Sequence, residues 1–91
     1  MELKDTIKLM DSDDYKERFK AEYYQTKIRY EKLNKLNNKI EAYYHLDYDK
    51  RNIMEEPKHD CPAGMLRDQQ QIMGNYLHIL EVRAEIEEIK L

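Results

Sequence analysis

Between residues 15 and 44, apolar or weakly polar side chains recur at steps of four or three residues. No glycine or proline interrupts this stretch, so nothing in it breaks a helix. Steps of this kind keep one face of a helix apolar along its whole length. We therefore predict a long helix over residues 14–45 that packs along this face. The recurring set is Tyr15, Phe19, Tyr23, Thr26, Tyr30, Leu33, Asn37, Ile40 and Tyr44.

A second long helix is predicted over residues 62–88, with Pro62 in the first helical position and Asp60 or Cys61 as the cap. Two apolar stripes run along it, and one neighbouring helix cannot cover both. An exposed stripe of that length favours self-association. The first stripe holds Leu66, Gln69, Met73, Tyr76, Leu80 and Ala84, and the second holds Met65, Ile72, Ile79, Val82, Ile86 and Ile89.

The remaining segments are short. Residues 1–10 carry Leu3, Ile7 and Met10 at helical spacing and predict a short N-terminal helix. Residues 46–60 contain helix-disfavouring residues, including Pro57, and predict a linker with irregular turns. A chain of 91 residues allows one domain. We predict an all-α fold with a short N-terminal helix and a long antiparallel helix pair, assembled as a homo-oligomeric helical bundle.

The charge distribution is uneven. The net charge is −3, but residues 16–39 carry eight bases and three acids, which leaves −8 for the remainder. A protein that binds long nucleic acid is usually basic overall, so we expect no such partner. A local basic surface fits a small anion or a protein partner. Alternatively, the basic helix lies against the acidic tail, which holds Glu81, Glu85, Glu87 and Glu88.

The sequence carries no enzyme motif: there is no GxSxG, no glycine-rich phosphate loop and no HExxH. His59, Asp60 and Cys61 are consecutive and cannot all reach one tetrahedral ion. We expect neither catalysis, nor a metal, nor a cofactor. A single cysteine favours a reducing compartment, and no apolar run is long enough for a membrane span or a signal peptide. These features predict a cytoplasmic protein.

The stretch YKERFKAEYYQTKIRY at residues 15–30 combines aromatic and basic side chains. Tyr23 and Tyr24 are adjacent and point about 100° apart, so at least one faces solvent or a partner. Two interpretations remain open. The tyrosines seal contacts between subunits, since tyrosine suits interfaces. Alternatively, some stack on a planar ligand such as a nucleobase, with arginine and lysine on its phosphate.

The segments DYKERFKAEYYQTKIRYEKL and CPAGMLRDQQQIMGNYLHILEVRAEIEEIKL resemble small tailed-phage proteins related to a crAss-like phage protein. The shared pattern places an aromatic residue three before an arginine, a glutamate four after it and a basic residue seven further on. A late helix then has polar and apolar residues at helical steps. The matching positions are Tyr15, Arg18, Glu22, Arg29, Leu66, Gln69 or Gln70, Met73, Tyr76, Leu80 and Arg83.

More distantly, the chain is similar to the phage anti-CBASS sponge proteins, which are small helical homo-oligomers that sequester cyclic oligonucleotides without cleaving them. Their pockets use an aromatic residue at the start of the long helix and a basic residue about four turns later, at the places of Tyr15 and Arg29. The linker is longer here, and Thr26 replaces an apolar residue of that pattern. The resemblance implies a phage counter-defence protein in the cytoplasm of the infected bacterium.

Tyr15 and Arg29 are 14 residues apart, or about 21 Å along a helix, so they can share a ligand only across two crossing subunits. The alternatives are a helical module that inhibits a host or phage protein, or a structural oligomer without a ligand. The predicted partners are a second copy of the chain and a small anionic nucleotide. The predicted ligand-binding residues are Tyr15, Lys16, Arg18, Lys27 and Arg29. The predicted oligomer interface holds Tyr23, Tyr24, Met65, Ile72, Tyr76, Ile79 and Ile86.

Overall fold

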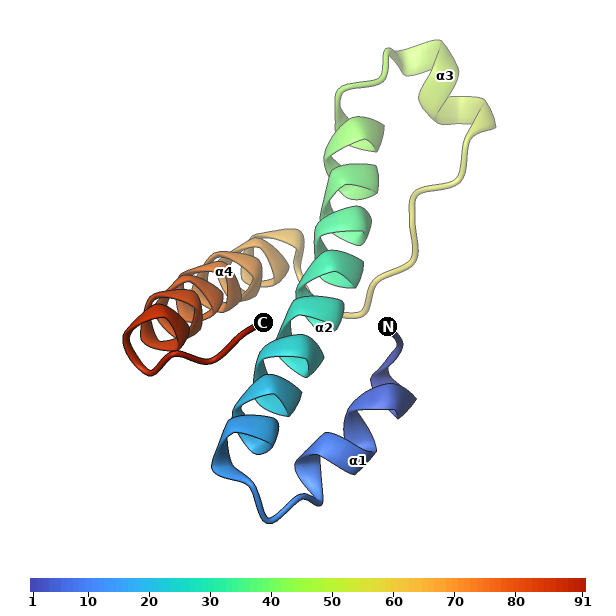
Figure 1. Ribbon diagram of the computed structural model, residues 1–91. Coiled ribbons are helices and arrows are strands. Elements are labelled where there is room, and N and C mark those ends of the chain that lie inside the picture. Colours follow the sequence, from blue (N-terminus) through green and yellow to red (C-terminus); the bar gives the residue numbers. More distant parts are fainter.

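A computed structural model describes residues 1–91 and shows helices without any strand, which confirms the all-α class (Figure 1). The molecule is elongated, with extents of 55 × 25 × 19 Å. None of its helices combines the length and the apolar character that a membrane span requires. The elements in chain order are a 3₁₀ turn η1 (Leu3–Thr6), α1 (Ile7–Met10), α2 (Tyr15–Tyr44), α3 (Tyr48–Ile53) and α4 (Ala63–Ile86).

Helix α2 is the longest element of the molecule. It begins after Asp14, whose carboxylate accepts a hydrogen bond of 3.0 Å from the Lys16 amide and so caps the first turn. Its thirty residues contain no helix breaker. The buried side chains Phe19, Tyr23 and Ile40 belong to the predicted seam, while Tyr15 and Tyr44 at its two ends are exposed.

Helix α4 crosses α2 and forms the main contact of the fold (Figure 1). The C-terminal part of α2 contacts the N-terminal part of α4, where Asn37 donates a hydrogen bond of 3.2 Å to the Leu66 carbonyl. At the other end, Tyr15 reaches Glu87 beyond the end of α4. Between these contacts lies one small core, made of Phe19, Tyr23, Leu77, Leu80, Ala84 and Ile89. The fold therefore depends on the crossing of these two helices.

The end of α4 differs from the sequence expectation. The helix stops at Ile86, and Glu88 takes a left-handed conformation with φ of 57°. The Ile89 amide then donates to the Ala84 carbonyl at 2.8 Å, which is the bond of a Schellman motif. This turn folds Ile89 into the core instead of leaving it on the second apolar stripe.

The N-terminal segment packs on α2. Thr6 is fully buried, and its hydroxyl accepts a hydrogen bond of 3.0 Å from the Gln25 amide. The same hydroxyl donates to the Leu3 carbonyl at 2.7 Å. Leu3, Ile7 and Met10 nevertheless remain exposed, so a buried threonine rather than the apolar residues anchors this segment.

The segment between the long helices holds the six-residue helix α3, capped by Asp47 through a 3.0 Å bond from the Lys50 amide. The sequence predicts irregular turns there, so this short helix is a difference from that prediction. Pro62 is the N-cap of α4 and not its first helical residue, and no side chain caps this helix. Cys61 is exposed and does not act as a cap through its side chain.

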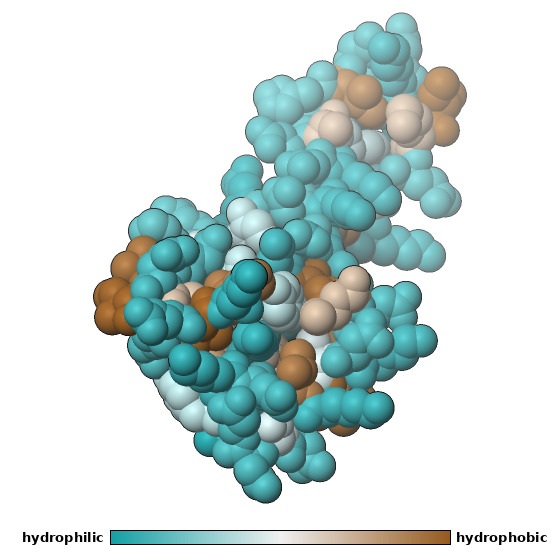
Figure 2. Space-filling model, in the orientation of Figure 1, coloured by the Kyte–Doolittle hydropathy of each residue, from teal (hydrophilic) through white to brown (hydrophobic).

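The second apolar stripe of α4 is uncovered. Ile72, Ile79 and Ile86 are 67%, 53% and 75% exposed, and Met65 and Val82 are exposed as well. Figure 2 shows apolar side chains gathered at the left of the view, where the C-terminal end of α4 lies in Figure 1. This face is free to meet another protein surface.

Candidate functional site

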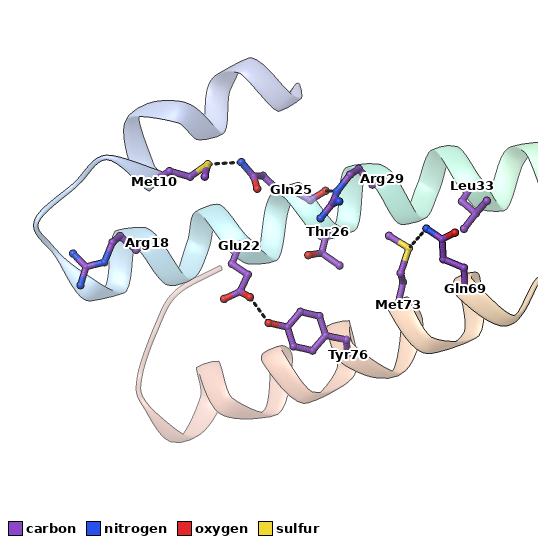
Figure 3. A pocket seen from close by; sticks show the side chains of 10 residues that line it. All are labelled: Met10, Arg18, Glu22, Gln25, Thr26, Arg29, Leu33, Gln69, Met73 and Tyr76. Carbon is purple, nitrogen blue, oxygen red and sulfur yellow. Dashed lines mark hydrogen bonds between the residues drawn. The ribbon is translucent and has the colours of Figure 1, made fainter. Parts of the chain in front are cut away.

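A groove of about 650 Å³ runs between α1, α2 and α4. Its α2 wall is one continuous stripe, because residues at steps of three and four share a helix face. That wall includes Arg18, Glu22, Gln25 and Arg29, and Leu33 continues it. Gln69, Met73 and Tyr76 of α4 form the opposite wall, and Met10 closes the α1 side (Figure 3).

The groove contains the guanidiniums of Arg18 and Arg29 and one carboxylate, that of Glu22. Arg18 donates through Nη1 to the Ser12 carbonyl at 2.8 Å, and Arg29 donates through Nε to the Gln25 carbonyl at 3.4 Å. Neither guanidinium forms an ion pair. Since a guanidinium carries five N–H donors, most donors of both side chains remain free for an anion.

The polar groups of the α4 wall are partly engaged. The Tyr76 hydroxyl donates to the Glu22 carboxylate, and this bond, together with burial, raises the pKa of Tyr76 (Figure 3). The bond also ties Glu22 to α4. Gln69 lies beside the Met73 sulfur at 3.9 Å. The groove thus offers two basic groups, polar side chains and the apolar surfaces of Leu33 and Met73.

The five predicted ligand-binding residues fall into three places. Arg18 and Arg29 both line the groove. Tyr15 and Lys16 lie instead at the far end of α4, where Lys16 Nζ donates to the Glu88 carbonyl at 3.4 Å. Lys27 is nine residues after Arg18 and therefore on the opposite side of α2, with Nζ 5.8 Å from the centre of the Tyr23 ring.

The predicted interface residues also separate. Met65, Ile72, Ile79 and Ile86 lie on the exposed face of α4, and Tyr76 lies between that face and the groove. Tyr23 is only 6% exposed and belongs to the core, so its ring offers little surface to another subunit. Tyr24 packs against this core and meets the Tyr23 ring edge-on at 5.2 Å.

The predicted ligand-binding set contains only two of the ten groove residues, Arg18 and Arg29, and leaves out Met10 and Gln25 among others. Gln25 is seven residues after Arg18 and four before Arg29, so helical spacing alone places it on their face. Met10 carries no such signal, because its position depends on how the N-terminal segment folds back onto α2.

The sequence pattern that defines the Sequestin family matches residues 13–86, which include α2, α3 and α4 and exclude α1. No curated protein and no solved structure shows significant similarity to the chain.

Proposed function

The chain belongs to the Sequestin family, and from that premise we propose that it binds a small anionic nucleotide messenger and retains it without cleavage. The family name describes a protein that sequesters another molecule. Retention requires a site with affinity for the ligand but no reactive groups. The observation that carries the proposal is the groove with the two unpaired guanidiniums of Arg18 and Arg29.

The size and chemistry of the groove support a nucleotide. Its volume of about 650 Å³ is in the range of small-ligand pockets. Guanidinium groups bind phosphate with two parallel hydrogen bonds, and Arg18 and Arg29 are eleven residues apart on one face of α2, or about 16 Å. Arg29 would bind a phosphate of the cyclic oligonucleotide while Gln25 and Gln69 meet base edges, and Arg18, further along the same face, would add to the positive potential of the groove.

We propose that a second copy of the chain packs on the exposed face of α4. Met65, Ile72, Ile79 and Ile86 follow one another at steps of seven residues, which is the spacing of a helix seam that packs against another helix. Ile72 and Ile79 are four before and three after Tyr76, which lines the groove. A second copy on this face would lie beside the groove and shield it from water.

The biological setting of the proposal comes from the resemblance to phage proteins. We propose a counter-defence protein that acts in the cytoplasm of an infected bacterium and removes a nucleotide immune signal. The exposed α4 face also favours a second candidate, a helical module that inhibits a host or phage protein through this face. The two functions differ in whether a nucleotide binds at all.

Calorimetric titration of the chain with cyclic dinucleotides, cyclic trinucleotides and cyclic ADP-ribose isomers separates the two candidates. We expect saturable binding of at least one compound, which is then released intact when the protein is heat-denatured. Absence of binding to the whole panel would reject the nucleotide proposal and leave the protein-inhibiting one. A cleaved product would show that the protein is an enzyme.

A further inference from the structure

The exposed apolar stripe of α4 is symmetric about its own middle. Met65 and Ile86 lie equally far on either side of the point between residues 75 and 76. Ile72 and Ile79 also lie equally far from that point, nearer the middle. Two subunits related by a two-fold axis use the same patch on both, so the patch must be complementary to itself. This stripe meets that requirement when the second helix runs in the opposite direction.

Two charged residues on the stripe follow the same symmetry with opposite signs. Asp68 lies four residues before Ile72, and Arg83 lies four residues after Ile79, so both share the helix face of the stripe. Both are equally far from the middle. Asp68 is exposed and forms no ion pair within the chain. Arg83 uses two of its five N–H donors within the chain, which leaves the others free for a neighbour.

These charges select the direction of a partner helix. In an antiparallel pair, Asp68 of each chain lies opposite the partner's Arg83, and this contact occurs twice. In a parallel pair in register, Asp68 would face the partner's Asp68, and Arg83 would face the partner's Arg83. Like charges in contact disfavour the parallel pair, and its helix dipoles would also be aligned side by side. The antiparallel pair avoids both costs.

We propose that two copies of the chain pair through this stripe with their α4 helices antiparallel, across a two-fold axis between residues 75 and 76. This orientation rests on the second copy proposed above and adds its direction and register. Met65 then meets the partner's Ile86, and Ile72 meets the partner's Ile79. A face that binds a different protein needs no internal symmetry of this kind, so the pattern favours a second copy of this chain.

The pairing also brings two grooves together. Tyr76 lines the groove and lies next to the axis, on the flank of the stripe that faces the groove (Figure 3). In an antiparallel pair, the two-fold axis is perpendicular to both helices and to the line that joins them. It therefore places this flank beside the same flank of the partner's helix. The two grooves open on the same side of the pair, and the partner's Tyr76 lies beside each of them.

Cysteine cross-linking tests the direction of the pair. Met65→Cys and Ile86→Cys are made as separate variants in a Cys61→Ser background, because Cys61 is exposed. The two variants are co-expressed with tags of different size and then oxidised. Residues 65 and 86 are 21 residues apart, or about 32 Å along the helix, so a disulfide joins them only between antiparallel chains. We expect the mixed product to exceed both products of like variants.

Reversing a charge on the stripe tests the register. Asp68→Lys should raise the dissociation constant of self-association, measured by analytical ultracentrifugation, about fivefold or more, because both of its contacts become repulsive. In a parallel pair this change would exchange one like-charged contact for another and have little effect. Glu85→Lys makes the same change of charge on an exposed residue outside the stripe and should associate like the wild type.

The proposal is overturned if the cross-links join like variants, if Asp68→Lys associates as well as Glu85→Lys, or if the wild type is monomeric. Calorimetric titration judges the nucleotide proposal separately. A monomer that binds a nucleotide would reject the pairing alone. Antiparallel cross-links in a protein that binds no nucleotide would support the pairing and reject the nucleotide.

Discussion

The hydroxyl of Tyr15 donates a hydrogen bond of 2.8 Å to the carboxylate of Glu87, which follows it by 72 residues in the sequence. Arg83 joins this contact, donating to the Tyr15 hydroxyl at 2.7 Å and to Glu87 at 3.0 Å. Its guanidinium also lies 5.1 Å from the centre of the Phe19 ring. These hydrogen bonds connect the start of α2 to the end of α4. Tyr15, which the sequence suggested for stacking on a ligand, therefore has a partner within the fold.

Replacing Tyr15 by phenylalanine should weaken the contact between the start of α2 and the end of α4 without changing the affinity for a nucleotide. The ring keeps its edge-on contact with Phe19, but Glu87 and Arg83 lose the hydroxyl. We expect a small decrease in Tm and unchanged binding in a calorimetric titration. A loss of binding with unchanged Tm would place Tyr15 at the ligand.

The same contact has a pH signature. The Tyr15 hydrogen bond holds the pKa of Glu87 below its usual value. Ionised Glu87 therefore stabilises the folded state fully above the pKa of about 4.3 that it has in the unfolded chain. This stabilisation is lost as the pH falls through the lowered pKa of Glu87 in the folded state. Thermal unfolding of the wild type should thus lose more stability between pH 6 and pH 3 than that of Tyr15→Phe. Equal losses would mean that the contact does not persist in solution.

Substitution of Glu88 by glycine should stabilise the chain. Glu88 has φ of 57°, a conformation that costs a residue with a side chain about 1 kcal/mol and costs glycine almost nothing. We expect a gain of roughly 0.5–1 kcal/mol in urea unfolding. Glu85→Gly, inside α4, is the matched control and should lose about 1 kcal/mol. A loss in both variants would contradict the turn that folds Ile89 into the core.

The long helices were predictable because their periodicity depends only on local spacing. The stripe of Leu66, Leu80 and Ala84 and the exposed stripe of Ile72, Ile79 and Ile86 follow from steps of three, four and seven residues. Ile89 was misplaced because a glutamate rarely adopts the left-handed conformation that ends a helix, so nothing in the sequence marked the turn. The spacing of the apolar residues therefore predicted that the helix continues through this turn to residue 88.

The candidate site was predictable only in part for the same reason. Arg18 and Arg29 share a face of α2, and their spacing shows it. The roles of Tyr15, Lys16 and Glu87 depend on a contact across 72 residues, which no local pattern encodes.

The linker should be most ordered between about pH 4.5 and pH 6.5. The Cys61 carbonyl, and then Glu56, raise the pKa of His59, so its stabilising contribution is present below about 6.5 and is lost as the pH rises through the raised value. Hydrogen bonds from Tyr44 and His59 lower the pKa of Glu56, whose contribution is lost at acidic pH. Amide hydrogen exchange over residues 54–61, corrected for the intrinsic pH dependence, measures this order. In His59→Gln, the loss above pH 6.5 should vanish; if it persists, another group is responsible.

A charge on the exposed face of α4 should abolish self-association. Ile72 is 67% exposed within the chain, so Ile72→Glu leaves the core intact but places a carboxylate in the proposed subunit contact. Light scattering after size exclusion should show a multiple of 11.2 kDa for the wild type and a single chain for the variant. Gln71→Glu adds the same charge at the neighbouring position outside the stripe and should remain oligomeric. A wild type that is already monomeric would remove this contact from the proposal and leave the groove to act alone.

Removal of the Arg29 side chain should separate binding from folding. The Arg29 side chain makes one hydrogen bond within the chain, to the Gln25 carbonyl, so Arg29→Ala is expected to keep the Tm and the subunit number of the wild type. Hydrogen bonds to charged groups contribute about 1.5–3 kcal/mol, which corresponds to roughly a 10- to 100-fold loss of nucleotide affinity. Lys35→Ala removes an exposed cation of α2 that does not line the groove and should bind like the wild type.

If both variants lose the same modest affinity, the ligand senses only the overall charge of α2. If Arg29→Ala binds normally, the nucleotide lies elsewhere.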